Sequence, residues 1–600
     1  RTIHNLLKIL SPKDKAKIIY ILLLMILLGV FEIIGVASIG PFTALLMDKE
    51  LYETNKLFLS INSVIKTNSY NEFFIFYSFL TFFILFFINI LAMIFNIFIN
   101  RFSNFQSHRS SVNLFRNYLN KPYDFFLRNH EDKLSKNILT EVHRGVGGII
   151  LPVITIISKT ISLLCIFIFL CFINFYITLY AILILFLFYL GIFYFFKKKL
   201  TLLGKRSNLA MFSRFKFVNE SFNNIKYLKL SGNENKFADF FFEPSKEDAN
   251  TKTLSTIYGI LPRYVVEVIA FFFIILLSIA LVTKNTSNIT EFLPIIGIFC
   301  MATFRIIPSM QNIYSSLASL RYNMPSFDLI FKDLNHQKDK DKDLGQLKNK
   351  IEKFIRIELK NYSFSYSASE KKIDIPSLKI TSGSIIGLCG RSGSGKTTTL
   401  DLISGILSPV SGQLLLNDNQ INPNKKYYHK YFSYVPQNSF LFQASVAENI
   451  SLEKLDTIKQ NPNIIQKIHK AIEKAELKDL INELPDNIFS TIGSGEKNFS
   501  HGQVQRVGIA RTLYQNREII ILDESTNSLD LITENKIFNN IINLNKTIII
   551  VSHKIELLKQ CNYLYYFKNN KLYKEGSKNK TEKILEELTK DNLNFKEKKF

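Results

Sequence analysis

The sequence predicts a protein of two dissimilar parts, an all-α membrane domain followed by a water-exposed α/β domain. Residues 18–313 carry nearly all of the long Ile, Leu and Phe runs, whereas residues 340–600 have the composition of an ordinary globular domain. With 600 residues, 47% of them hydrophobic, the chain is too long for one core and too apolar for a wholly soluble protein. We therefore expect a membrane domain at 1–331, a charged linker at 332–350 and a second domain at 351–600.

Six stretches of the first domain are apolar over the length of a membrane span. A hydrocarbon core about 30 Å thick requires roughly 20 apolar residues in a helix. Six spans place both ends of the domain on the same side of the membrane. The predicted spans are residues 18–46, 73–99, 149–173, 175–196, 264–283 and 290–312.

The segments between these spans differ in length and in charge. Residues 100–148 and 197–263 are far longer than a turn needs, so we expect their helices to continue into the cytoplasm. Residues 57–65 place apolar side chains at helical spacing, which is typical of a helix lying on the lipid surface and equally of a packed loop. The five cysteines are scattered and odd in number, which supports neither a disulfide framework nor a zinc cluster.

The formal net charge of +24 would permit nucleic-acid binding, but its distribution favours a membrane orientation. Lys and Arg concentrate at the N-terminus and in the two long segments, whereas the connections near 48–72 and 283–291 carry few. Basic loops prefer the cytoplasmic side of a membrane. We therefore expect no nucleic-acid partner and a multi-pass protein whose second domain is cytoplasmic.

The second domain alternates strand-like and helical stretches, which predicts a largely parallel sheet with helices on its faces. A strand-like run at 384–389 leads into a glycine-rich loop and then a helix. Glycines let backbone N–H groups surround phosphate oxygens, and the helix N-terminus adds a favourable dipole. The spacing predicts that Lys396 reaches the β- and γ-phosphates of ATP and that Thr397 binds Mg²⁺. The predicted nucleotide-binding residues of this loop are Gly390, Arg391, Ser392, Gly393, Ser394, Gly395, Lys396, Thr397 and Thr398.

A second apolar strand, residues 519–523, ends in two adjacent carboxylates, Asp523 and Glu524. Ligands of open α/β sheets bind at the carboxyl ends of the strands. Asp523 is the expected Mg²⁺ ligand, and Glu524 is the expected general base that polarises the attacking water. Together with the glycine-rich loop, this strand predicts hydrolysis of ATP.

The segment Phe499-Ser-His-Gly-Gln503 and the helix after it resemble the signature motif of ATP-binding cassette (ABC) transporters. The resemblance covers essentially the whole chain, because six spans ahead of one cassette resemble an exporter half-transporter of the type I fold. It implies that Tyr366 stacks on adenine and that His553 contacts the γ-phosphate. It also implies that Gln437 joins the catalytic and metal-binding residues and couples them to the membrane helices.

The same resemblance implies a homodimer with two composite ATP sites. In that family the residues corresponding to Ser500, Gly502 and Gln503 bind the ATP held by the opposite subunit, and Asp530 works across the dimer. The sequence departs from the family pattern at three positions. Phe499 and His501 replace the commoner Leu and Gly, and Ser494 stands where exporters usually place an acidic residue. Slower turnover or altered coupling is the expected effect.

Few ionisable residues interrupt the predicted spans, and such residues usually face a cavity or a partner. Arg263 has Glu267 four residues on, which is also the spacing of an ordinary helical ion pair. Pro262-Arg263 with Glu267, and Arg305 in the last span, resemble the PglK family of lipid-linked oligosaccharide flippases, in which cavity arginines receive a lipid diphosphate. Asn312 stands where that family, as we align it, has a further basic residue.

The expected function is therefore ATP-driven flipping of a polyprenyl-diphosphate oligosaccharide or related glycolipid across the bacterial inner membrane, with Arg263 and Arg305 at the substrate. An unpaired ionised group faces a cost on the order of tens of kcal/mol in hydrocarbon, so such a lipid does not cross unaided. Export of lipid A-like lipids, peptides or hydrophobic drugs is the alternative. A soluble-type ABC ATPase tethered to the membrane is a third reading.

Overall fold

The computed structural model describes residues 2–47, 49–67, 69–284, 289–335, 353–366, 372–423, 426–493, 499–577 and 582–587. The chain divides into two units. One unit comprises Arg1–Lys121 and Phe126–Gln346, and the other comprises Pro122–Phe125 and Leu347–Phe600. Most of the expected linker 332–350, and the predicted departure at Ser494, lie outside the described residues.

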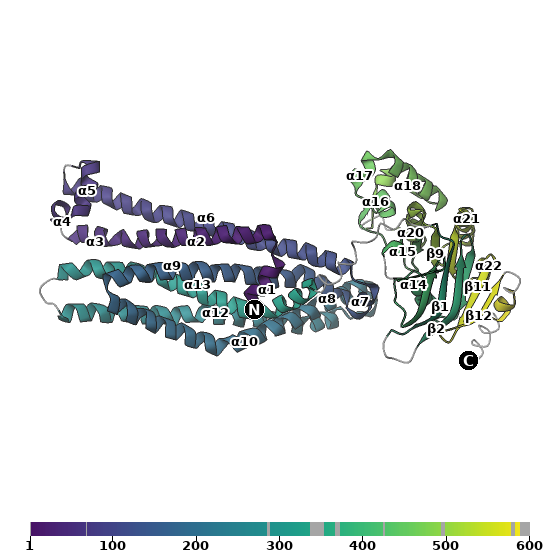
Figure 1. The fold of residues 1–600 in the computed structure, drawn as a ribbon, viewed down its shortest axis with the longest axis horizontal. Helices are drawn as coiled ribbons and strands as arrows, with labels where there is room; N and C mark the ends of the chain where they lie inside the picture. Colours follow the sequence, from purple (N-terminus) through teal and green to yellow (C-terminus); the bar gives the residue numbers. More distant parts are fainter. Residues whose placement is uncertain are drawn as a thin grey trace. The chain divides into compact units, whose positions relative to one another are not determined.

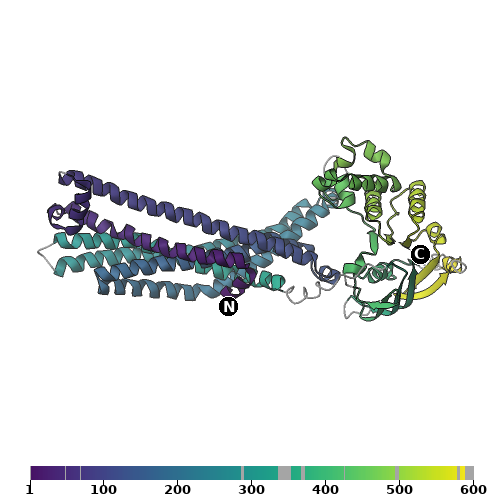
Figure 2. The same cartoon turned by 45° about the horizontal axis from the view of Figure 1, so that its top comes forward.

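The first unit is a bundle of long helices that run side by side (Figures 1 and 2). Four of them have 47 to 51 residues, which corresponds to about 70–77 Å at 1.5 Å per residue and exceeds the bilayer core. Its helices are α1 (Thr2–Ile9), α2 (Pro12–Ala37), α3 (Ile39–Met47), α4 (Leu51–Thr54), α5 (Lys56–Ile65), α6 (Tyr70–Leu119), α8 (Glu131–Lys136), the π-helical turns η1 (Asn137–Glu141) and η2 (His143–Gly147), α9 (Gly148–Ile173), α10 (Phe175–Asn223), α11 (Ile225–Ser231), α12 (Glu234–Lys284) and α13 (Ile289–Asn335). A further helix, α7 (Tyr123–Arg128), is divided between the two units.

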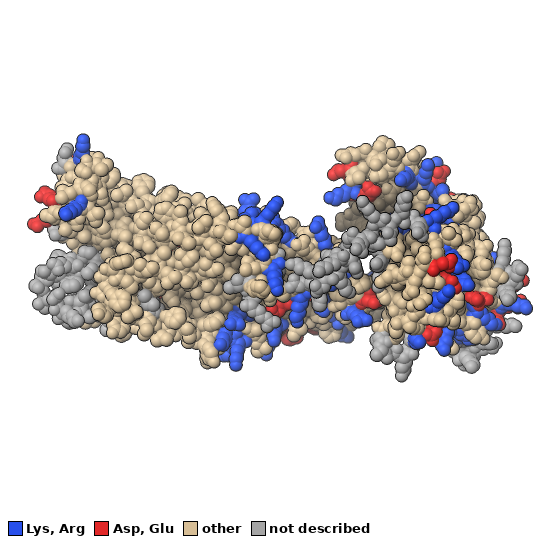
Figure 3. Space-filling view, in the orientation of Figure 1, with Lys and Arg blue, Asp and Glu red and all other residues tan. Residues whose placement is uncertain are grey.

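Three helical segments among the described residues are long and apolar enough to cross a membrane, namely Pro12–Met47, Tyr70–Leu119 and Glu131–Ile173. The other three predicted spans lie within α10, α12 and α13. Asn174, in extended backbone between α9 and α10, supplies the break predicted between the third and fourth spans. Figure 3 shows a long face of this unit with almost no charged side chain, bordered by clustered Lys and Arg. This charge-free band is what a hydrocarbon layer requires.

The segment predicted at 57–65 forms the short helix α5. Its Phe58 is 2% exposed and packs with Leu45, Phe73 and Tyr77. The opposite side of the helix presents apolar groups, since Val64 is 82% exposed. The segment is therefore both packed on one side and apolar on the other.

The second unit contains a ten-stranded sheet in the order β5-β4-β1-β2-β12-β11-β3-β10-β9-β6, with helices packed against it (Figure 1). The elements are β1 (Arg356–Phe364), β2 (Ile373–Thr381), β3 (Ile385–Gly390), α14 (Lys396–Ile403), β4 (Ser411–Leu416), β5 (Asn419–Ile421), α15 (Lys426–His429), β6 (Phe432–Val435), β7 (Ala444–Ser445), α16 (Val446–Ser451), α17 (Leu455–Gln460), α18 (Pro462–Lys474), α19 (Lys478–Asn482), η4 (Asn487–Phe489), β8 (Thr491–Ile492), α20 (His501–Gln515), β9 (Ile519–Asp523), α21 (Leu531–Ile542), β10 (Thr547–Val551), α22 (Ile555–Lys559), β11 (Tyr563–Lys568) and β12 (Lys571–Ser577).

The prediction of a largely parallel sheet holds for one half of it only. Strands β11, β3, β10, β9 and β6 are parallel neighbours, whereas β5, β4, β1 and β2 pair antiparallel. The parallel strands are buried on both faces and read as continuous apolar runs, as in the all-buried pattern of β9 and β10. Strands β1 and β2 of the antiparallel half have nine residues each, but they mix buried with exposed positions, so they give a weaker sequence signal than unbroken apolar runs.

Candidate functional site

The glycine-rich loop joins β3 to α14 and has a backbone that requires glycine. Gly390 has φ +146° and Gly395 has φ +97°, a region that L side chains rarely adopt. A Cβ on Gly390 would lie 2.3 Å from the carbonyl oxygen of Phe567 on the neighbouring strand β11. The loop therefore keeps its backbone N–H groups close to the start of α14, which is the arrangement that surrounds phosphate oxygens.

Lys396, the first residue of α14, is buried and points back onto its own loop. Its Nζ donates hydrogen bonds to the carbonyl oxygens of Gly390, at 2.8 Å, and Arg391, at 2.9 Å. Burial lowers the pKa of this ammonium group, and the nearby Glu524 carboxylate opposes that shift. Thr397 lies at the same helix end and is exposed. These positions suit a phosphate chain laid along the loop.

Tyr366 follows β1 and covers the loop from the other side. Its hydroxyl is 2.9 Å from the Thr398 hydroxyl, and its ring contacts Phe364 edge-on at 4.9 Å between centroids. The residue is 52% exposed, so one face of the ring is open for stacking. The structure thus places Tyr366 beside the predicted nucleotide-binding loop.

Three of the predicted catalytic side chains meet at the carboxyl end of the parallel strands. The Glu524 carboxylate accepts a hydrogen bond from Gln437 Nε2 at 3.0 Å and lies 3.1 Å from His553 Nε2. Asn527, which sequence reasoning did not single out, donates to the same carboxylate at 3.3 Å. Glu524 itself has φ +47°, a strained value for a residue that is not glycine. The Glu524 carboxylate is therefore held by Gln437 and His553, which come from separate segments, and by Asn527 three residues further on.

Asp523 lies one residue earlier and is 4% exposed. Tyr434 on β6 donates its hydroxyl to Asp523 Oδ2 at 3.1 Å. Burial raises the pKa of Asp523, while the Tyr434 hydrogen bond and the Lys396 charge oppose the rise. Among the described residues no cluster of three or more His, Cys, Asp or Glu forms a complete metal site. The donor set fits Mg²⁺ held by Asp523 and Thr397 together with phosphate oxygens.

The signature residues lie at the start of α20 and are engaged locally. The Ser500 hydroxyl accepts from the backbone N–H of Gln503 at 3.3 Å, and Gln503 Oε1 accepts from the backbone N–H of Ser500 at 2.8 Å. This is a capping box, which leaves the Ser500 and His501 side chains exposed. Asp530 likewise caps α21 by accepting from Thr533 N–H at 2.9 Å, which lowers its pKa.

The hydrogen bonds of Ser500, Gln503 and Asp530 described above are local to the first turns of α20 and α21. Instead, the buried Gln505 connects three segments of the site. Its Nε2 donates to the Gln437 carbonyl at 3.4 Å, and its Oε1 accepts from Ser528 N–H at 3.3 Å. Sequence reasoning missed Gln505, although its place two residues after the signature is a usable signal.

Arg511 fixes α20 to the segment that follows Gln437. Its Nε donates to the Asn449 carbonyl at 2.8 Å and a terminal nitrogen donates to the Phe440 carbonyl at 3.2 Å. The guanidinium also lies over the Phe440 ring, 4.8 Å from its centroid. These contacts pack the signature helix against the segment that follows Gln437.

The predicted substrate residues lie on two different helices. Arg263 on α12 donates from Nε to Glu267 Oε1 at 2.7 Å, so the helical ion pair is present. Arg305 on α13 lies 3.5 Å from Asn89 Oδ1 on α6. Asn312 is exposed on α13. The two arginines therefore have different partners, Glu267 for Arg263 and Asn89 for Arg305.

Comparison with known proteins agrees with this arrangement. Residues 18–306 match the ABC transporter transmembrane region, and residues 373–527 match the ABC transporter ATP-binding family. A solved structure of a bacterial Atm1-family ABC exporter with ATP bound superposes with a TM-score of 0.75 at 19% identity and covers 97% of both chains. The chain therefore belongs to the ABC transporters and has the type I exporter fold, a helical transmembrane domain fused to a P-loop ATP-binding domain.

Curated relatives share shorter segments. The mesentericin-Y105 transport/processing ATP-binding protein of Leuconostoc mesenteroides is 34% identical over 239 residues, 39% of this chain and 32% of that protein. A probable ABC transporter ATP-binding/permease protein of Haemophilus influenzae is 33% identical over 220 residues, 36% of this chain and 39% of the relative. The transport/processing ATP-binding protein ComA of Streptococcus pneumoniae is 30% identical over 218 residues, 36% and 30% respectively. The matches span about a third of the length of these relatives.

An ATP-binding domain of this class couples hydrolysis of ATP to transport. The matches of both domains thus identify the chain as a membrane protein of the exporter class. Which molecule it moves is a separate question.

Proposed function

We propose that two copies of this chain form an ATP-driven exporter in the bacterial inner membrane, with the ATP-binding domains in the cytoplasm. The observation that carries the proposal is the Glu524 carboxylate, which Gln437 and His553 hold at 3.0 and 3.1 Å beside the buried Lys396. A base held in this way is oriented before substrate binds. The exposed Ser500, turned to solvent at the start of α20, supports a composite site completed by a second copy.

The roles of the chain's own residues follow from this arrangement. The loop N–H groups and Lys396 bind the phosphates, Tyr366 stacks on the base, and Glu524 accepts a proton from the attacking water. Bound Mg²⁺ supplies charge neutralisation on the phosphate oxygens when it is present. Within the chain, Lys396 donates to loop carbonyls, and the Glu524 carboxylate contacts Gln437 and His553, so contacts inside the chain position both groups.

For the substrate, we propose a peptide in preference to a diphosphate glycolipid. Two of the relatives are named for transport and processing, one of them for mesentericin-Y105. The charge of Arg263 is offset by Glu267 at 2.7 Å, which weakens the case for a diphosphate at that arginine. Glycolipid flipping stays the second candidate because Arg305 lies within a predicted span and contacts a neutral partner, Asn89 Oδ1, at 3.5 Å.

The test uses purified protein in proteoliposomes. Glu524→Gln is expected to bind ATP and to lose steady-state hydrolysis by about 10²–10⁴-fold, the usual contribution of a general base. Glu518→Gln, at an exposed glutamate directly before β9, is the matched control and is expected to hydrolyse normally. Normal turnover by Glu524→Gln would remove this residue from the base role.

Measuring what ATP drives into the lumen of the vesicles distinguishes the two substrate classes. We expect peptide uptake, and ATPase stimulation by peptide, in vesicles of the wild-type protein. Glycolipid flipping that is lost in Arg263→Ala/Arg305→Ala while ATPase activity persists would favour the second candidate instead.

A further inference from the structure

Gln505 is a buried amide on the signature helix α20, and it is 4% exposed. A buried amide costs free energy unless its donor and its acceptor both have partners. The Nε2 of Gln505 donates to the Gln437 carbonyl oxygen at 3.4 Å, and its Oε1 accepts from the Ser528 N–H at 3.3 Å. One side chain therefore joins the backbones of two segments that are far apart in the sequence.

Two glycines on the same face of α20 bring both segments close to Gln505. Gly502 and Gly508 lie three residues before and three residues after it, which is the spacing of neighbours on one helix face. A Cβ on Gly502 would lie 2.9 Å from the Ser528 carbonyl oxygen. A Cβ on Gly508 would lie 2.5 Å from the Oγ of Ser439, two residues after Gln437. Both segments thus approach α20 more closely than a residue with a side chain allows.

The two segments that Gln505 joins are also the ones that orient the Glu524 carboxylate. Gln437 Nε2 donates to Glu524 Oε2 at 3.0 Å. Asn527, the residue before Ser528, donates from Nδ2 to the same oxygen at 3.3 Å. Glu524 has φ +47°, a conformation that costs free energy, so its surroundings must hold it in place. One oxygen of the proposed base is therefore oriented by two segments, and the Gln505 amide bonds to the backbone of both.

We propose that Gln505 is a positioning residue for the Glu524 base. Its hydrogen bonds go to backbone groups, so it acts on the carboxylate through Gln437 and Asn527. Glutamine suits this role because its amide offers both a donor and an acceptor without carrying a charge. The placement of a base matters, since a displacement of about 1 Å can lower a rate by about 10²-fold. The proposal rests on the proposed role of Glu524 in ATP hydrolysis.

The experiment measures kcat and KM for ATP with purified full-length protein in proteoliposomes. Gln505→Met keeps an unbranched side chain of similar length and removes both hydrogen bonds. We expect kcat to fall roughly 10- to 100-fold, while KM for ATP changes by less than about 2-fold because the phosphate-binding loop is unaltered. Thermal unfolding of each variant reports whether it is folded.

Thr547→Val is the matched control. Thr547 is 1% exposed, and its hydroxyl also joins two backbone groups, donating to the Thr381 carbonyl at 3.5 Å and accepting from the Gly383 N–H at 2.9 Å. It is the first residue of β10, at the opposite end of this strand from the ATP site. Its replacement removes the same kinds of hydrogen bond, and we expect kcat to stay within about 2-fold of wild type.

Two double variants distinguish positioning of the base from a packing role. Asn527→Ala removes one of the groups that hold the Glu524 carboxylate and should lower kcat on its own. Combined with Gln505→Met, it should lower kcat by less than the product of the two single effects, because both act on the same oxygen. In a Glu524→Gln background, Gln505→Met should cause no further loss, because the base is already absent.

A kcat of Gln505→Met that falls no more than that of Thr547→Val would overturn the proposal. An equally large loss in the Glu524→Gln background would also overturn it and assign Gln505 to packing alone. Normal hydrolysis by Glu524→Gln would defeat the base role and the positioning role together, whereas loss of hydrolysis in Glu524→Gln with full activity in Gln505→Met would defeat the positioning role only. If Gln505→Met does not fold, Gln505→Glu takes its place under the same criteria, since it keeps the acceptor for Ser528 and loses the donor to Gln437.

Discussion

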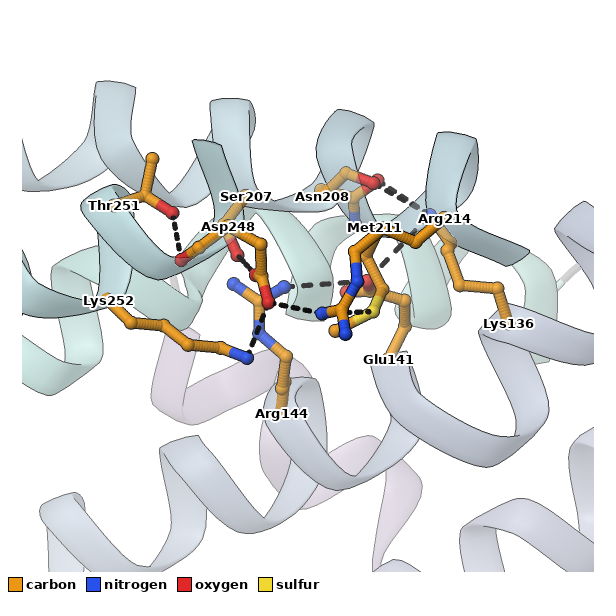
Figure 4. Close-up of polar contacts among 10 residues, drawn as sticks. All are labelled: Lys136, Glu141, Arg144, Ser207, Asn208, Met211, Arg214, Asp248, Thr251 and Lys252. Carbon is orange, nitrogen blue, oxygen red and sulfur yellow. Dashed lines mark hydrogen bonds and ion pairs between the residues drawn. The ribbon is translucent and has the colours of Figure 1, made fainter. Parts of the chain in front are cut away.

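Replacing Asp248 by Asn removes one of the two buried carboxylates, Glu141 and Asp248, in the charge cluster of the helical unit drawn in Figure 4. The Asp248 side chain is 3% exposed and pairs with Arg214 at 2.6 Å and Lys252 at 2.7 Å, with Ser207 at 3.1 Å. Breaking a fully buried ion pair costs about 3–5 kcal/mol. Because the Arg214 side chain is 29% exposed and that of Lys252 is 52% exposed, both cations regain some water, and we expect about 2–3 kcal/mol.

The assay is thermal unfolding of the purified full-length protein in one detergent at one pH. At about 2 °C per kcal/mol for a unit of this size, the midpoint of Asp248→Asn should fall by roughly 4–6 °C. Glu220→Gln is the matched control on the same helical unit. Its pair with Lys216 is 3.8 Å long with both side chains nearly half exposed, so its loss should cost about 0.5 kcal/mol or less.

A second variant keeps the prediction independent of a general folding defect. Asp248→Leu combined with Arg214→Met replaces the buried pair by apolar groups of similar size and should recover part of the loss. If Asp248→Asn shifts the midpoint no more than Glu220→Gln does, the reasoning that buried charge pairing joins α10 to α12 is wrong.

Further predictions concern packing, metal binding and pH. Gly204→Ala should lower the unfolding midpoint strongly, because a Cβ there would lie 2.0 Å from a carbonyl oxygen of α13. Gly191→Ala is the control: a Cβ there would meet nothing within 4 Å, so the change should be neutral or stabilising by up to about 1 kcal/mol. Tyr434→Phe removes the hydrogen bond to Asp523, so ATPase activity should need several-fold more Mg²⁺ with a similar maximal rate, and an unchanged Mg²⁺ titration would contradict this role. Burial raises the pKa of Asp401 to about 6, so the folded protein loses stability as pH rises from about 4 to 6. The unfolding midpoint of Asp401→Asn should therefore rise relative to that of wild type between about pH 4 and 6, measured in nucleotide-free EDTA buffer. A difference between the two midpoints that stays constant with pH would contradict the raised pKa of Asp401.

Much of the ATP site could be predicted from local sequence because its parts are local in the chain. The loop from Gly390 to Lys396 specifies its own backbone through glycines at positive φ, and the two buried strands before it and before Asp523 read as unbroken apolar runs. The antiparallel half of the sheet was not predicted. Its strands mix buried with exposed residues, and β1 pairs with both β2 and β4, so the pairing is set by contacts between separate segments.

The support around the site depends on the fold in the same way. Gln505 joins segments that are 68 and 23 residues away, and Tyr434 reaches Asp523 across 89 residues. The spacing of residues along the sequence does not show that these side chains lie within hydrogen-bond distance of each other. The same holds for Asp248 and Arg214, whose pairing across 34 residues follows from two antiparallel helices lying side by side.

The sequence by itself determined the class of each half of this protein. Two local patterns are enough for this: apolar runs long enough to span a bilayer, and a glycine-rich loop before a lysine. The hydration of apolar groups and backbone sterics act on these segments independently of how the rest of the chain packs. Only the tertiary structure decided which charges became buried partners and which distant segments support the ATP site. Those outcomes depend on how helices far apart in the chain pack, because the energy of a charge is set by what surrounds it in space.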